Sequence, residues 1–174
     1  MFAPNTAEAV RCTGGWLFDQ VMAGWDVTVM TDDHSDPRPL HILGASVRDL
    51  DSVPDTPAMG QCLRAVAVRA DLYESDKRVR QMVRTALDQG QADVRFWGDH
   101  WPDGFRAATG PVSHELSLAA RAFKAEAMAA AAMPAAGVTV AGVTAADLGS
   151  YVEMFRRGEI SRSALAGVGD GKLS

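Results

Sequence analysis

The feature that most constrains the fold is an alternation of strand-like and helix-like segments between residues 39 and 98. The strand-like segments are apolar and rich in β-branched residues, whereas the segments between them carry charges at helical spacing. The predicted strands cover residues 39–45, 63–73 and 92–98, and the predicted helices cover residues 46–53 and 75–90. Alternation of this kind is typical of parallel sheets, because each helix carries the chain back to the start of the next strand. The sequence therefore predicts an α/β fold with a mainly parallel four- to five-stranded sheet, covered by helices in two or three layers.

The segments on either side of this stretch extend the same fold. We expect a helix at 5–24, a strand at 25–31, a long alanine-rich helix at 113–133 and a further helix at 144–158. In terms of domains, these assignments give an α/β domain over 1–142, a C-terminal helix within 143–158 and a flexible tail over 159–174.

The direction of the strand at 25–31 depends on the loop that follows it. The connection from Thr31 to Pro39 is shorter than the dozen or so residues that a parallel crossover needs. The strand at 25–31 is therefore predicted either to run antiparallel to the strand at 39–45 or not to lie beside it.

Composition narrows the classes of partner and the compartment. The formal net charge of −5 argues against binding to nucleic acid or to anionic membranes, since both need clustered positive charge. The alanine-rich stretch at 125–146 contains Pro134 and is too weakly apolar for a membrane span. The first residues lack the basic and apolar segments of a signal peptide, and Cys12 and Cys62 match no metal-ligand spacing. We therefore expect a cytoplasmic protein, and the excess of Arg over Lys, fourteen to three, is typical of GC-rich bacterial genomes.

The main candidate site follows two of the predicted parallel strands. Ligands of open α/β sheets bind at the carboxyl ends of the strands, which is where Asp71, Asp99 and His100 are expected. Two carboxylates and an imidazole can hold a divalent metal ion and a phosphate, or act as an acid and a base. The aromatic side chains expected to wall a binding pocket there are Tyr73, Trp97 and Trp101. The alternative is structural, because acidic residues after strands often cap the next helix.

A second group of candidate metal ligands lies in the loop after the strand at 25–31. Its members are Asp32, Asp33, His34 and Asp36. Carboxylates and a neutral imidazole suit Mg²⁺, Mn²⁺ or Zn²⁺. The alternative is a polar turn, because Asp and Pro are strong turn formers. If the preceding strand is antiparallel, this loop also lies at the wrong edge of the sheet for a ligand.

The predicted helix at 75–90 carries a row of cations opposite its apolar stripe. Within that row, Arg80 and Arg84 are candidate contacts for an anion or an acidic partner. The alternative is an ordinary solvated face, since amphipathic helices place their charges outward.

The chain contains no complete catalytic motif. It lacks a glycine-rich phosphate loop, a nucleophile elbow and a zinc-protease motif, and the pair Gly14–Gly15 is interpreted as a break in the first helix. We therefore expect a binding or regulatory domain that self-associates through the alanine-rich helix or the C-terminal helix. The alternative is a metal-dependent hydrolase that acts on a phosphate-bearing small molecule, with Asp71, Asp99 and His100 at its centre. A divalent metal ion is the one cofactor that these residues suggest.

Overall fold

The computed structural model describes residues 1–33, 36–52, 63–90, 92–100, 102, 111–132 and 151–158. The strands are β1 (Thr28–Thr31), β2 (Ser46–Asp49), β3 (Ala65–Arg69), β4 (Asp93–Trp97), β5 (Val112–Glu115) and β6 (Val152–Arg157). The helices are α1 (Thr6–Met22), α2 (Arg38–Ile42), α3 (Ala70–Ser75), α4 (Lys77–Asp88) and α5 (Leu118–Ala132), with a 3-10 turn at Leu50–Ser52. Within these ranges, no helix has the length and apolar character needed to cross a membrane.

Residues 1–3, here called the N-terminal segment, join two groups of strands into one sheet. β1 pairs with β2 in parallel, and β3 pairs with β4 in parallel. Phe2 forms parallel bridges to Met30 in β1 and to Val68 in β3, and its N–H donates to the carbonyl of Ala67 at 2.8 Å. The antiparallel strands β6 and β5 continue the sheet beyond β4. The order across the sheet is therefore β2, β1, N-terminal segment, β3, β4, β6, β5.

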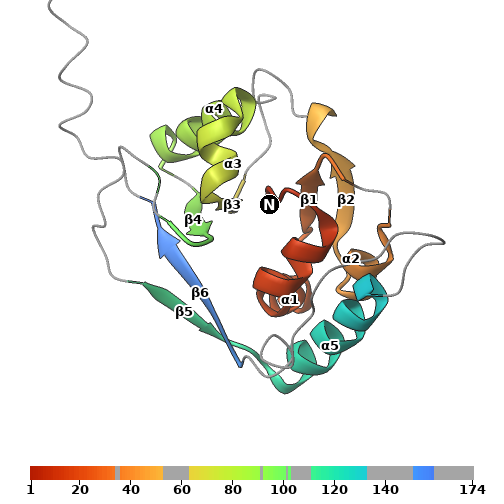
Figure 1. Cartoon of the computed structure of the whole chain (residues 1–174). Helices are drawn as coiled ribbons and strands as arrows, with labels where there is room; N and C mark the ends of the chain where they lie inside the picture. The colour runs from red at the N-terminus through yellow and green to blue at the C-terminus, as the bar shows by residue number, and fades with distance from the viewer. Residues whose placement is uncertain are drawn as a thin grey trace, which may run out of the picture.

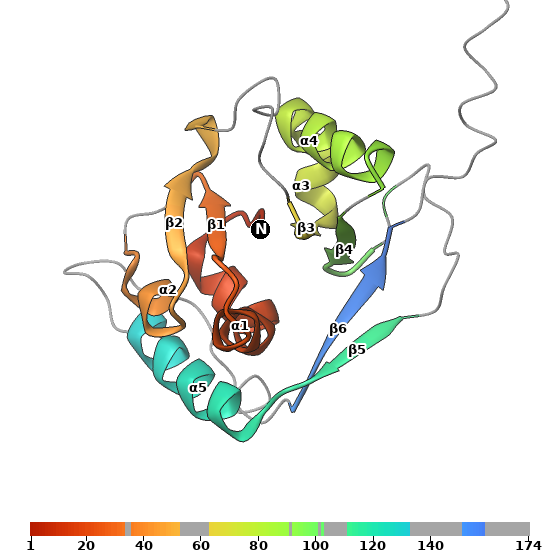
Figure 2. The same ribbon diagram turned by 180° about the vertical axis from the view of Figure 1, so that it is seen from behind.

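Helices cover both faces of this sheet. α1, α2 and α5 lie together on one side, and α3 and α4 lie on the other (Figure 1); the view from behind shows the same grouping (Figure 2). Because side chains alternate between the faces of a strand, Ala67 lies in the core with α1 and α5, whereas Val66 and Val68 lie in the core with α3 and α4. Ala3 lies in the core with α1 and α5, and Phe2 lies in the core with α3 and α4. The predicted α/β fold with a mainly parallel, helix-covered sheet is confirmed.

The antiparallel or distant placement predicted for the strand at 25–31 is wrong. β1 runs parallel to β2, from the pair Thr28–Ser46 to the pair Thr31–Asp49. The expectation failed because 39–45 is not a strand: Arg38–Ile42 forms α2, in which Pro39 occupies the first turn, where its missing N–H costs no hydrogen bond. The strand begins only at Ser46, within the predicted helix at 46–53, so the crossover is long enough for parallel pairing.

The C-terminal helix predicted within 143–158 is also wrong where the structure describes it. Residues 152–157 form β6, which pairs with β4 and β5 and so belongs to the α/β sheet. Along β6, Glu153 and Phe155 are buried while Val152 and Met154 are exposed, the period of two that a strand produces. Residues 143–150 and the tail predicted at 159–174 lie outside the described residues.

The long helix predicted at 113–133 starts later than expected. Residues 112–115 form the strand β5, whose burial alternates, and α5 begins at Leu118. Ser117 caps α5, since its Oγ accepts the N–H of Ala120 at 3.0 Å. The same serine hydroxyl donates to Asp19 of α1 at 2.6 Å, so the cap also joins α5 to α1.

Candidate functional site

The sheet has a topological switch point between the N-terminal segment and β3. From the N-terminal segment, the chain passes through α1 to β1 and then to β2, on one side of that segment. It then crosses to β3 and β4 on the other side, with α3 and α4 on the opposite face of the sheet. Connections that leave in opposite directions open a crevice at the carboxyl ends of the strands, where ligands of such sheets bind.

A cavity of about 390 Å³ lies at that end of the sheet. Its walls come from residues 11–12 of α1, Arg69 at the end of β3, residues 97–99 at the end of β4, Lys124 of α5 and residues 152–154 of β6. We call it the switch-point cavity. Its volume is in the lower part of the range of about 300–1,000 Å³ that is usual for small-molecule sites.

Arg69 is the central charge beside the switch-point cavity. Its Nε lies 2.8 Å from Oδ1 of Asp71, and its Nη1 contacts the carboxylate of Glu8 in the first turn of α1. Arg11 also pairs with Glu8, with 3.3 Å between Nη2 and Oε1. The guanidinium of Arg69 lies 5.7 Å from the ring centroid of Trp97, within cation–π range. Arg69 therefore neutralises two carboxylates and fixes the first turns of α1 and α3 to the end of β3.

Trp97 and Gly98 shape the wall at the end of β4. Trp97 is 3% exposed, and its indole Nε1 is buried without a hydrogen-bond partner in the part of the chain that the structure describes. Gly98 has a φ of +116°, a conformation that residues with a Cβ rarely adopt, so the glycine allows the chain to turn sharply out of the sheet. This turn carries Asp99 to the cavity.

The cavity also contacts a buried ion pair. Nζ of Lys124 lies 2.7 Å from Oε1 of Glu153, and both side chains are almost fully buried. Glu153 accepts two further hydrogen bonds, from the N–H of Gly15 at 2.9 Å and from the N–H of Trp16 at 2.8 Å.

The helix break predicted at Gly14–Gly15 is absent, since α1 runs through both glycines. At Gly15 the reason for glycine is space, because a Cβ there would lie 2.2 Å from Cδ2 of Leu116.

The three residues of the main predicted site lie in different surroundings. Asp99 lines the switch-point cavity, while Asp71 is bound to Arg69. Nε2 of His100 lies 2.9 Å from Oε2 of Glu74 on α3. These three side chains do not form a metal-ligand cluster among the described residues. The prediction that they share one centre therefore has no geometric support.

The other predicted binding residues near this edge contact the protein itself. Tyr73 is buried and packs edge-on against Phe96, with 5.4 Å between ring centroids. Arg84 donates to the hydroxyl of Tyr73 at 3.4 Å. Arg80 donates to the carbonyls of Tyr73, at 3.2 Å, and Glu74, at the end of α3. Trp101 lies outside the described residues.

The described residues of the second group of candidate metal ligands, in the loop after β1, also have different surroundings. Asp36 pairs with Arg38 at 2.8 Å, and the hydrogen bond from Arg38 holds the pKa of Asp36 below its ordinary value, against the smaller effect of burial. Asp33 forms an isolated bridge to Asn5, and its carbonyl accepts from Thr6. His34 lies outside the described residues. The side chain of Asp36 therefore has the structural role that its turn chemistry indicated, since it accepts the N–H of Arg38 at 3.1 Å, whereas these contacts of Asp33 are made by its main chain.

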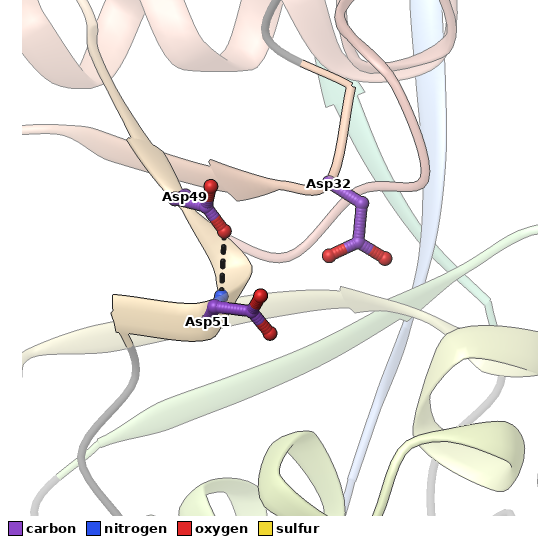
Figure 3. Close-up of side chains that lie close together, drawn as sticks. All are labelled: Asp32, Asp49 and Asp51. Atoms are coloured by element: carbon purple, nitrogen blue, oxygen red, sulfur yellow. Dashed lines mark hydrogen bonds between the residues drawn. The ribbon is translucent and has the colours of Figure 1, made fainter.

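Asp32, however, meets two carboxylates that the sequence did not indicate. Asp32, Asp49 and Asp51 offer oxygens that all lie within 4.8 Å of one another, at the ends of β1 and β2 (Figure 3). All three side chains are exposed, Asp49 accepts the N–H of Asp51 at 2.7 Å, and Arg78 pairs with Asp51 at 2.5 Å. This acidic group depends on the parallel pairing of β1 with β2, which brings Asp49 beside the end of β1.

Sequence reasoning missed the charges that define the switch-point cavity. Arg69 carried a detectable signal, since a charged residue directly follows the apolar strand that precedes Asp71. Glu153 carried no such signal in the sequence, because residues 144–158 were predicted to form a helix and the structure has β6 there. Glu8 and Lys124 looked like ordinary polar positions of helices, and only packing brings them to partners.

Comparison with known proteins supports the fold. The chain is similar in structure to the antimicrobial reagent A40926 pseudoaglycone deacetylase Dbv21, with a TM-score of 0.55 and 19% sequence identity over 74% of this chain and 78% of that chain. No protein-family model and no curated protein matches the sequence. At this level of identity, the likeness shows a shared α/β fold.

Proposed function

We propose that this chain is a binding protein that holds a small polar molecule in the switch-point cavity. The observation that supports the proposal most directly is the position of the cavity, at the carboxyl ends of β3 and β4 beside the reversal of strand order. Its walls offer both signs of charge, from Arg11 and Asp99, as a site for a polar ligand requires.

The pairing of charges favours binding over catalysis. Glu8 and Asp71 are both bound to Arg69, and Glu153 is bound to Lys124 and to two N–H groups of α1. A general base needs a carboxylate that is free to accept a proton from the substrate. Internal cations already occupy these three carboxylates, so Asp99 is the carboxylate of the cavity that a hydrolase would use as its base.

Thermal-shift measurements on three proteins test this proposal. They are the wild type, Arg11→Gln at the cavity, and Arg48→Gln as a matched control, since Arg48 is exposed on β2 and does not line the cavity. The panel of probes is citrate, glucose 6-phosphate, glucosamine, glutamate and trialanine. At 100 times its Kd, a ligand stabilises the folded state by about 2.7 kcal/mol, which raises Tm by several degrees. We expect one class of compound to stabilise the wild type and the control more than Arg11→Gln. A panel without effect, or equal shifts in all three proteins, would contradict the proposal.

A hydrolase is the second candidate, because the structural neighbour is described as a deacetylase. Its metal-dependent form is tested by incubating the wild type and Asp99→Asn with Mg²⁺, Mn²⁺ or Zn²⁺ and two substrates, p-nitrophenyl phosphate and N-acetylglucosamine. Release of phosphate or acetate that disappears in Asp99→Asn would support the hydrolase. If the chain binds a ligand without hydrolysing it, we expect no more phosphate or acetate than in a control that contains the metal ion and no protein.

A further inference from the structure

We propose that the ligand of the switch-point cavity is a short extended peptide, in which the main-chain N–H and C=O of one residue pair with the edge of β6 at Met154 and the terminal carboxylate lies against Arg11. This inference rests on the proposed binding function and adds the chemical class of the ligand.

The main-chain groups of β6 point alternately toward β5 and toward β4. The carbonyl of Tyr151 accepts the N–H of Leu116 of the neighbouring chain segment at 3.0 Å. In an antiparallel pair, hydrogen-bonded and non-hydrogen-bonded positions alternate. Leu116 and Tyr151 therefore form a hydrogen-bonded pair. Ser113 and Met154 form the third pair along from it in the register of β5 and β6, so theirs is a non-hydrogen-bonded pair. The N–H and the C=O of Met154 consequently point away from β5, toward the side of β4.

β4 ends before it reaches Met154. The N–H of Gly158 donates to the carbonyl of Val94 at 2.9 Å, which confirms that the even-numbered residues of β6 face β4. The last pair between the strands is Phe96–Arg156, and in Figure 1 β6 meets β4 only near its arrowhead. The next hydrogen-bonding position on β4 would be Gly98, where the chain turns out of the sheet.

The switch-point cavity lies between these diverging chains, since Gly98 and Met154 both line it. Among the described residues, Met154 therefore has no partner on the β4 side for its main-chain N–H and C=O. Such an open strand edge binds an extended peptide by adding it to the sheet, and the N–H and C=O of one peptide residue then supply the donor and the acceptor.

The remaining walls match the two ends of a peptide and its side chains. Arg11 is 40% exposed beside the cavity and offers a guanidinium to a terminal carboxylate, while Asp99 offers a carboxylate to a terminal ammonium. Val152 and Met154 present apolar side chains, 38% and 53% exposed, to small side chains of the peptide. Trp97, which is 3% exposed, closes the wall of the cavity beside Gly98. A cavity of about 390 Å³ limits the peptide to a few residues.

Three ligands measured by isothermal titration calorimetry test the main-chain contact and the carboxylate contact. They are trialanine, trialanine N-methylated at the nitrogen of its central residue, and trialanine with a C-terminal carboxamide. We expect trialanine to bind, and each modification to weaken binding by about tenfold, through the loss of one hydrogen bond or of the charge-assisted contact. In Arg11→Gln the free acid and the carboxamide should bind equally, whereas Arg48→Gln should behave as the wild type.

Amide NMR spectra of ¹⁵N-labelled protein locate the bound peptide. We expect the signals of Met154, Gly98 and the indole N–H of Trp97 to shift on titration with trialanine. Binding that leaves the Met154 signal unchanged would overturn the proposed edge contact. If glucosamine or citrate binds the cavity and trialanine does not, the peptide is excluded while the binding function stands. If no probe binds, both proposals fail.

Discussion

At the scale of single residues, the molecule depends on charges that are buried together. Lys124 and Glu153 lie 2.7 Å apart, and the remaining oxygen of Glu153 accepts the N–H of Trp16. An uncompensated charge at such a site costs several kcal/mol, so each partner requires the other. The pair links α5, β6 and α1, which are far apart in the sequence, at the wall of the switch-point cavity.

The first prediction concerns the charge of Glu153. Glu153→Gln keeps the shape and one acceptor oxygen but leaves the ammonium of Lys124 buried without a countercharge. We expect the free energy of unfolding, measured by urea denaturation, to fall by about 3 kcal/mol. The control is Glu115→Gln on β5, which is exposed and should change stability by less than about 0.5 kcal/mol. Equal stabilities of the two variants would show that the pair is not buried as described.

A second prediction uses the glycine pair of α1. A Cβ at Gly15 would lie 2.2 Å from the buried side chain of Leu116, whereas at Gly14 the nearest atom would be Cδ1 of Leu43 at 3.3 Å. Gly15→Ala should therefore destabilise the fold by about 1–3 kcal/mol through overpacking. In Gly14→Ala the gain in helix propensity, about 1 kcal/mol, should offset most of the milder contact. Thermal unfolding followed by circular dichroism compares the two, and a higher Tm for Gly15→Ala than for Gly14→Ala would refute this account.

At the scale of elements, the junction of α1 with β5 and α5 is held by one carboxylate. Asp19 of α1 lies 2.8 Å from Nε2 of His114 on β5 and accepts the hydroxyl of Ser117, the cap of α5. Burial raises the pKa of Asp19, but hydrogen bonds from Ser117 and His114 outweigh it and hold this pKa below the ordinary value of 3.8. The junction is therefore strongest while Asp19 is ionised.

This junction predicts a specific response to acid. Because the pKa of Asp19 is lower in the folded state, the unfolded chain takes up the proton first as the pH falls. Ionised Asp19 should add about 1–2 kcal/mol to the free energy of unfolding. This stabilisation should be present in full above about pH 4 and should be lost as the pH falls through the lowered pKa of Asp19. Urea denaturation from pH 6 to pH 2 should show wild type and Asp19→Asn converging below about pH 4. The exposed Asp88→Asn is the control, and a wild-type advantage that persists to pH 2 would contradict the prediction.

At the scale of the whole molecule, α5 has one face inside the fold and another outside. Ala120 and Ala127 are buried in the core that α5 shares with α1, so this face of the alanine-rich helix packs within the chain. On its outer side, Leu118 is 81% exposed, and Phe123 stacks on Phe18 with 4.6 Å between ring centroids while remaining half-exposed. Self-association remains a prediction, and the exposed face of α5 is its natural location.

Light scattering tests this prediction directly. We expect the wild type to have a mass above that of one chain, and Phe123→Glu to lower it, because a charge cannot be buried in an apolar contact without a partner. Arg48→Glu, on the exposed surface of β2, should leave the mass unchanged. An equal mass for Phe123→Glu and wild type would exclude this face as the contact.

How far the sequence predicts this molecule depends on the range of the interactions involved. The strand at 92–98 and the helix at 75–90 were recognisable because their apolar periodicity is local, and β4 and α4 lie within those ranges. Residues 39–45 and 46–53 exchanged their expected roles, since short apolar segments suit either helix or strand until packing decides. Residues 152–157 were assigned to a helix because their pairing partners, β4 and β5, are remote in the sequence.

The sequence by itself determined the α/β class and the edge of the sheet where a ligand site was expected, because both follow from local periodicity and from the order of elements. Asp99 lines the cavity at that edge. Only the tertiary structure decided which groups meet there: Arg69 with Glu8 and Asp71, and Lys124 with Glu153. The contacts of Arg69 with Glu8 and of Lys124 with Glu153 join segments that are remote in the sequence. The energy of a charge depends on its burial and on its partners, neither of which is a property of the local sequence.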